Sequence, residues 1–115
     1  VYQAGYWLAQ RGKFNEALAI LKTAKNLDDP RILNYIGFVK RKLGHVREAV
    51  SYYRRALVIN PDYTIARAYF GEALLQMGLL DHAKHQLVEI YRRCGSACAE
   101  YGELSRQIVN YQHAQ

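Results

Sequence analysis

The sequence predicts an all-α protein built from repeated helical hairpins. Glycines recur in pairs seven residues apart along the chain: Gly5 and Gly12, Gly37 and Gly44, and Gly71 and Gly78. The segments after the second glycines align in three copies, with matching columns at Phe14, Val46 and Leu80, at Ala17, Ala49 and Ala83, at Leu21, Tyr53 and Leu87, and at Ala24, Ala56 and Ile90. Within each copy the apolar residues are three or four positions apart, which is the spacing of a helix face and not of a strand.

We expect seven helices in chain order, at residues 1–11, 14–27, 30–43, 46–59, 62–77, 80–93 and 98–112. A first helix precedes the aligned segment in each copy, and apolar residues such as Leu33 and Ile36 mark it in the middle copy. The last helix repeats the three-or-four spacing at Tyr101, Leu104, Ile108 and Tyr111. No strand is expected.

Turn residues agree with this division. Gly12, Gly44 and Gly78 follow the first helix of each pair, where a glycine in the left-handed conformation commonly ends a helix. The segments Asp29-Pro30 and Asn60-Pro61-Asp62 precede later helices. Proline lacks the N–H that a first turn leaves unpaired, and a neighbouring Asp or Asn can cap the free donors.

Small residues at inner helix positions indicate close packing within each hairpin. A glycine inside a helix costs about 0.5–1 kcal/mol, so it needs a packing reason. We expect Gly37 to face Ala49 and Gly71 to face Ala83, so that the two backbones of each hairpin approach closely.

The middle copy resembles the tetratricopeptide repeat, a helix–turn–helix unit of about 34 residues. The matching positions are Leu33, Ile36, Gly37, Gly44, Ala49, Tyr53, Ala56 and Pro61. The third copy keeps most of the pattern but has Ile90 and Gly95 in place of the second alanine and the closing proline. The first copy lacks most of its leading helix and has a linker two residues short.

The resemblance implies a right-handed α-solenoid of antiparallel helix pairs, with about three repeat units and a C-terminal capping helix. The expected division is a truncated first unit at 1–29, a second at 30–63, a third at 64–97, and the capping helix with its tail at 98–115, together one domain. The outer side of the capping helix is expected to be polar, with Glu100, Glu103, Arg106, Gln107 and Gln112. Because the chain starts at Val1, we interpret it as a fragment of a longer protein.

Composition excludes several classes of protein. Half of the residues are hydrophobic and only two are proline, which excludes a disordered chain, and no run of about 18 uncharged apolar residues could span a membrane. The sequence contains no nucleophile elbow, phosphate loop or H-E-x-x-H motif, so we expect neither an enzyme nor a cofactor. His82, His85 and Glu89 are spaced so that they could hold a metal ion on one face of a helix. No further ligand lies near them in the sequence, so we expect no metal site.

The resemblance also implies a groove, lined mainly by the first helices, that binds a peptide segment of another protein. Carried over by position, the groove residues are Tyr6, Gln10, Asn34, Phe38, Arg41, Tyr69, Glu72 and Gln76. A related subset of the family grips a C-terminal carboxylate with Lys, Asn and Arg, and that clamp is absent here. The rings of Tyr6, Phe38 and Tyr69 either contact a ligand or pack between hairpins, and both interpretations stay open.

A basic cluster supports a different kind of function. Sixteen Lys and Arg against ten Asp and Glu give a net charge of +6, and the densest positive group is Lys40, Arg41, Lys42, Arg47, Arg54 and Arg55. Such a cluster could dock on an acidic surface of nucleic acid or anionic lipid. No nucleic-acid motif accompanies it, so a protein partner is favoured. Self-association through the uncovered apolar face of the first hairpin is a third possibility.

Cys94 and Cys98 are a candidate disulfide at the junction before the last helix. A bridge would contribute about 2 kcal/mol and fix the capping helix to the last hairpin. It would also indicate a periplasmic or secreted protein, whereas two reduced thiols would indicate the cytoplasm. The localisation is therefore left open.

Overall fold

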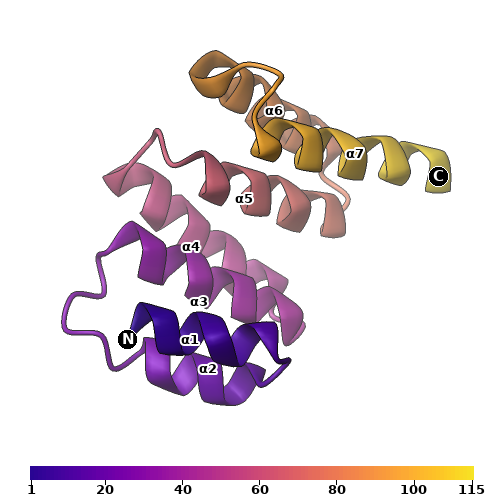
Figure 1. The fold of residues 1–115 in the computed structure, drawn as a ribbon. Coiled ribbons are helices and arrows are strands. Elements are labelled where there is room, and N and C mark those ends of the chain that lie inside the picture. The colour runs from indigo at the N-terminus through magenta and orange to yellow at the C-terminus, as the bar shows by residue number, and fades with distance from the viewer.

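The computed structural model describes all 115 residues and contains seven helices and no strand. In chain order they are α1 (Tyr2–Gln10), α2 (Phe14–Leu21), α3 (Pro30–Lys42), α4 (Val46–Ile59), α5 (Thr64–Gln76), α6 (Leu80–Cys94) and α7 (Ala99–Ala114). Figure 1 shows them stacked from the N-terminal pair to the C-terminal helix, in a body of 37 × 28 × 21 Å. The predicted all-α class is confirmed.

Consecutive helices form three pairs, α1/α2, α3/α4 and α5/α6, and neighbouring pairs meet through contacts of α2 with α3 and of α4 with α5. The first helices also touch, α1 with α3 and α3 with α5, so they share one face of the stack. Helix α7 packs on both α5 and α6 and covers the last pair, as a capping helix of a helical repeat protein does. The chain is thus an α-solenoid with a C-terminal cap.

The turn inside each pair has the same conformation in the three copies. Gly12, Gly44 and Gly78 have φ angles of 76°, 93° and 77°, a left-handed region that other residues enter only at a cost. In the middle copy the N–H of His45 then returns to the carbonyl of Lys40 at 2.9 Å, which satisfies one of the free carbonyls at the helix end. The helix stops predicted from the glycine spacing are confirmed.

Helix α2 is shorter than predicted. It ends at Leu21 and not at residue 27, because the following side chains bond to nearby backbone groups. Thr23 Oγ1 donates to the carbonyl of Ile20 at 2.6 Å, and Asn26 Oδ1 accepts from the N–H of Asp28 at 3.0 Å. Local bonds of this kind offer the backbone an alternative to the helix.

The two predicted helix starts have different outcomes. Asp29 caps α3 as expected, since its Oδ1 accepts from the N–H of Arg31 at 2.9 Å. Helix α5 begins at Thr64, two residues after the start expected at residue 62, and no side chain caps it. Asn60 Oδ1 accepts instead from the N–H of Asp62 at 3.1 Å, which makes a turn before the helix rather than a cap on it.

Two helical glycines make room for side chains other than the alanines expected from the sequence. A Cβ added at Gly37 would lie 2.8 Å from Cε1 of Tyr53, and one added at Gly71 would lie 2.6 Å from both methyl carbons of Leu104. Gly37 therefore accommodates a ring within its own hairpin. Gly71 accommodates the capping helix, which places α7 directly on α5.

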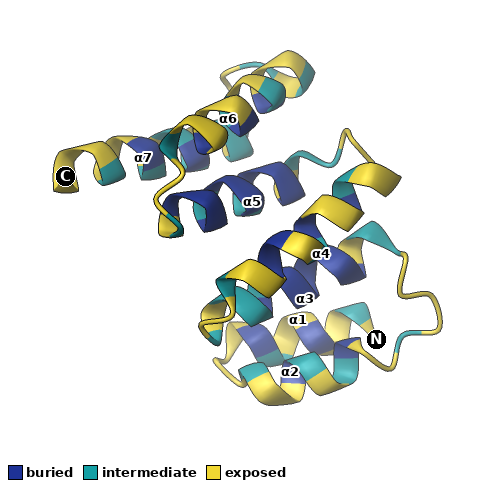
Figure 2. Cartoon of the chain, turned by 180° about the vertical axis from the view of Figure 1, so that it is seen from behind, coloured by how far each residue is buried: buried dark blue, intermediate teal, exposed yellow.

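Most of the core is supplied by α3 and α5, whose buried faces are seen in Figure 2 between the exposed outer faces of the other helices. Tyr53, Leu74 and Leu104 are completely or almost completely buried. Each buried side chain of this size contributes roughly 1.5–3 kcal/mol. These contacts hold α3, α5 and α7 in fixed relative positions, and these are the helices that surround the candidate site.

Candidate functional site

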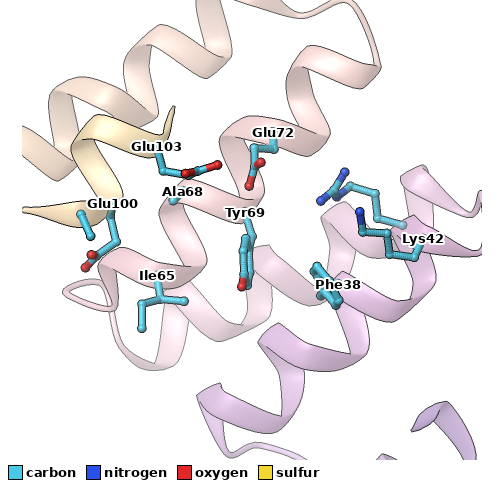
Figure 3. Close-up of a pocket in the computed structure, with 10 residues that line it drawn as sticks. Phe38, Lys42, Ile65, Ala68, Tyr69, Glu72, Glu100 and Glu103 are labelled. Carbon is cyan, nitrogen blue, oxygen red and sulfur yellow. The ribbon is translucent and has the colours of Figure 1, made fainter. Parts of the chain in front are cut away.

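A groove of about 450 Å³ opens between α3, α5 and α7. Figure 3 shows Phe38 and Lys42 on one side, Ile65, Ala68, Tyr69 and Glu72 along the middle, and Glu100 and Glu103 on the other side. Arg41 and Ala99 also line it. A second hollow of about 280 Å³ shares Arg41 and Glu72 with the groove and continues past Leu75, Gln76, Gln107 and Tyr111.

Five of the eight predicted groove residues line these two hollows: Phe38, Arg41, Tyr69, Glu72 and Gln76. Tyr6 lies away from them on α1 and is 42% exposed. Gln10 donates through Nε2 to the hydroxyl of Tyr35 at 2.7 Å, so its amide is already engaged. Asn34 is 1% exposed and faces the interior, so it offers nothing to a ligand in solution.

A row of aromatic rings runs along the first helices. The ring centroids are 5.4 Å apart between Tyr6 and Tyr35, 5.1 Å between Tyr35 and Phe38, and 5.3 Å between Phe38 and Tyr69. Pairs in this range contribute about 0.5–1.5 kcal/mol each beyond burial. The rings therefore pack between hairpins, and the half-buried Phe38 and Tyr69 also present a surface to the groove.

Burial changes the ionisation of several groups near this row. It raises the pKa of the Tyr35 hydroxyl to about 12, although the hydrogen bond from Gln10 opposes the shift. It also raises the pKa of the Glu72 carboxyl, and the positive charge of Arg41 opposes this shift in turn. The Glu72 carboxylate is thus held in a partly desolvated place, where a positive ligand group would stabilise it.

The groove wall made by α7 was not predicted. Glu100, Glu103 and Gln107 were expected on the outer side of the capping helix, and that expectation is wrong because all three line the hollows. Thr64 Oγ1 donates to Glu100 at 2.6 Å, which fixes the start of α7 to the start of α5. Their spacing of three and four residues runs as a stripe beside the buried Leu104, and this pattern was available in the sequence.

The basic cluster is divided among several places in the fold. Lys40 Nζ pairs with Glu48 at 3.1 Å, whereas Arg41 and Lys42 line the groove. Arg47 is exposed near the turn after α3. Arg54 and Arg55 line a separate hollow with Asp28, Val58 and Ile59, and Arg55 Nη2 lies 3.2 Å from Asp28 Oδ1. The structure therefore does not gather the six cations on one surface.

Cys94 and Cys98 lie at disulfide distance between α6 and α7, with Cα atoms 5.9 Å apart. No three His, Cys, Asp or Glu side chains are grouped so that they could hold a metal ion. Glu89 is instead engaged by Arg92 and Arg93, at 3.0 and 2.9 Å. None of the seven helices has the length and apolar character needed to cross a membrane.

Part of the chain matches a known protein family. The family model for the tetratricopeptide repeat matches residues 30–63, which contain α3 and α4. The chain therefore contains a tetratricopeptide repeat at these residues. A relative, the TPR repeat-containing protein PA4667 of Pseudomonas aeruginosa, is 38% identical over 71 residues. That match covers 59% of this chain and 12% of the relative, so the chain spans only a small part of the relative's length.

Solved structures share the whole arrangement of helices. The type III secretion chaperone SycD of Yersinia enterocolitica, in complex with a peptide of the translocator YopD, has a TM-score of 0.80 and 22% identity. The match covers 98% of this chain and 87% of the SycD chain. PcrH in complex with the chaperone binding region of PopD has a TM-score of 0.79 and 20% identity, covering 97% and 86%. At these identities the likeness concerns the fold.

Proposed function

We propose that this protein is a non-catalytic interaction scaffold whose groove binds a peptide segment of a partner protein. The groove between α3, α5 and α7 carries the proposal, because it is open to solvent and combines the rings of Phe38 and Tyr69 with charged side chains of both signs. Peptide-binding sites commonly combine apolar contacts with a few placed polar groups. SycD and PcrH, which share the fold, are each described in complex with a peptide or region of another protein, and this supports the proposal.

The first experiment replaces Lys42 with a photo-crosslinking amino acid. Lys42 is exposed and lines the groove, so the replacement reaches a bound segment without disturbing the core. The matched control carries the same amino acid in place of Arg54, an equally exposed cation that lines a different hollow. After irradiation in the source cell, we expect a discrete crosslinked protein from the Lys42 position and not from the Arg54 position.

Mass spectrometry of the crosslinked product then identifies the segment that was bound, and a synthetic copy of it is titrated against the purified chain. Crosslinking of equal strength from both positions, or from Arg54 alone, would contradict groove binding. The latter result, together with a steep loss of binding on adding salt, would favour docking of the cations on an acidic surface instead. Asn34 is unsuitable for such a test because its side chain is buried.

A further inference from the structure

The groove carries unpaired charges of both signs. Ion pairs occur elsewhere on the surface, but Arg41, Lys42 and Glu72 take part in none of them. All three side chains line the same groove. Arg41 and Glu72 are partly removed from water and have no ion-pair partner, which is costly, so both gain from a ligand group of opposite sign. Lys42 is exposed and adds a second positive charge beside Arg41.

The two cations lie on the α3 side of the groove. Arg41 Cζ and Lys42 Nζ are 6.0 and 5.5 Å from the centroid of the Phe38 ring, within the range of a cation–π contact. The Nε atom of Arg41 is buried, so a ligand reaches the guanidinium only through its outer end, where Arg41 lines both hollows. A guanidinium with free donors binds a carboxylate through two parallel hydrogen bonds, so this side is suited to an acidic side chain.

The carboxylates lie on α5 and α7, with Glu72 along the middle of the groove and Glu100 and Glu103 on its α7 side (Figure 3). Glu103 is paired with Arg106 on its own helix, and Glu100 accepts the hydrogen bond from Thr64. Glu72 has neither an ion pair nor a hydrogen bond, although it is half-buried. This side is therefore suited to a basic side chain, and Glu72 is the carboxylate that is free to receive it.

We propose that the groove selects a segment with an acidic side chain and a basic side chain close to one apolar residue, an inference that rests on the proposed function. The acidic group pairs with Arg41 and Lys42, the apolar residue contacts Phe38 and Tyr69, and the basic group pairs with Glu72. A segment with only acidic side chains leaves Glu72 unpaired, and a segment with only basic side chains leaves Arg41 and Lys42 unpaired. Charge complementarity thus defines the partner segment more narrowly than the apolar rings do.

The test uses random peptides of about twelve residues displayed on phage and selected on the immobilised full chain. We expect the selected peptides to be enriched in Asp or Glu together with Lys or Arg, near an apolar residue. One selected peptide is then titrated against three variants. Lys42→Glu and Glu72→Lys should each weaken it by about tenfold or more, the effect of losing one charge-assisted hydrogen bond. Arg54→Glu makes the same charge change outside the groove and should leave the affinity unchanged.

The outcomes separate this inference from the proposed function. Selected peptides without an excess of both charge types, but with binding that Phe38→Ser abolishes, would overturn the charge selection and keep the groove. A complete absence of groove binders would overturn both. If Arg54→Glu weakened binding as much as Lys42→Glu, only net charge would matter, and the proposal would be wrong. Lys42 is exposed, so its substitution tests the idea even if a change at Glu72 disturbs folding.

Discussion

The Leu104 side chain of α7 packs directly against Gly71 of α5. A Cβ added at Gly71 would lie only 2.6 Å from each of the two methyl carbons of Leu104. Leu104 is completely buried, and it joins the capping helix to the helix that forms the middle of the groove. The same contact that covers the last hairpin therefore also sets the position of the α7 groove wall.

We predict that Gly71→Ala destabilises the protein by about 1–3 kcal/mol, the usual cost of overpacking a core. The loss occurs although alanine is the better helix former. Gly102→Ala is the matched control, because that glycine lies inside α7 and a Cβ there meets nothing within 4 Å. It should stabilise the protein by about 0.5–1 kcal/mol. Urea unfolding of both variants measures the difference, and equal stabilisation would show that α7 is free to shift.

Glu72→Gln is predicted to stabilise the free protein at neutral pH. Burial raises the pKa of Glu72, so between the ordinary carboxyl value of about 4.3 and the raised value the folded state holds more protons than the unfolded state. The wild-type protein therefore loses stability as the pH rises through that window. The glutamine variant lacks this loss, so its advantage should shrink as the pH falls to about 4. Thermal unfolding at several pH values tests this, and a variant less stable at neutral pH would mean that Glu72 is paired.

Asp29→Ala should cost about 1 kcal/mol, because it removes the side-chain cap of α3. The hydrogen bonds from Arg31 lower the pKa of Asp29, so the capped state is favoured above the ordinary Asp value of about 3.9. This stability is lost as the pH falls through that value and towards the lowered one. Asp28→Ala is the control, since its pair with Arg55 is exposed and such pairs contribute about 0–1 kcal/mol. Equal effects of the two substitutions in urea unfolding would argue against the cap.

The proposed bridge between Cys94 and Cys98 should appear in mass spectrometry without reductant as the loss of two hydrogens. Reduction should then lower the free energy of unfolding by about 2 kcal/mol for so short a loop in the chain-entropy model. A Cys94→Ser, Cys98→Ser variant should show no response to reductant. A native bridge would favour an oxidising compartment, and two free thiols in freshly isolated protein would argue against it.

Much of the fold could be predicted from the sequence because its signals are local. The turn conformation at Gly44 and the cap at Asp29 depend on the residue itself and its near neighbours. The end of α2 was harder, since Thr23 and Asn26 compete with a helix that their apolar neighbours favour. Local side-chain hydrogen bonds therefore end α2 earlier than the repeat pattern predicts.

The site residues also divide into those that local sequence signals predict and those that depend on long-range packing. Phe38 and Tyr69 could be placed in the groove because they occupy repeated positions on α3 and α5. The burial of the Asn34 side chain could not be predicted in this way, because it depends on which neighbours α3 packs against. The wall at Glu103 was missed because the repeat pattern ends before α7 and long-range contacts set the orientation of that helix. The part of the site that the sequence predicts therefore ends where the repeats end.

The row of rings from Tyr6 through Phe38 to Tyr69 crosses both boundaries between successive hairpins. Removing the middle hairpin would strip Tyr35 and Phe38 from the row and leave the two remaining rings facing water. Adding a foreign hairpin at either boundary would separate rings that now touch. We therefore expect that replacing a single hairpin of this stack with a foreign one destabilises the protein.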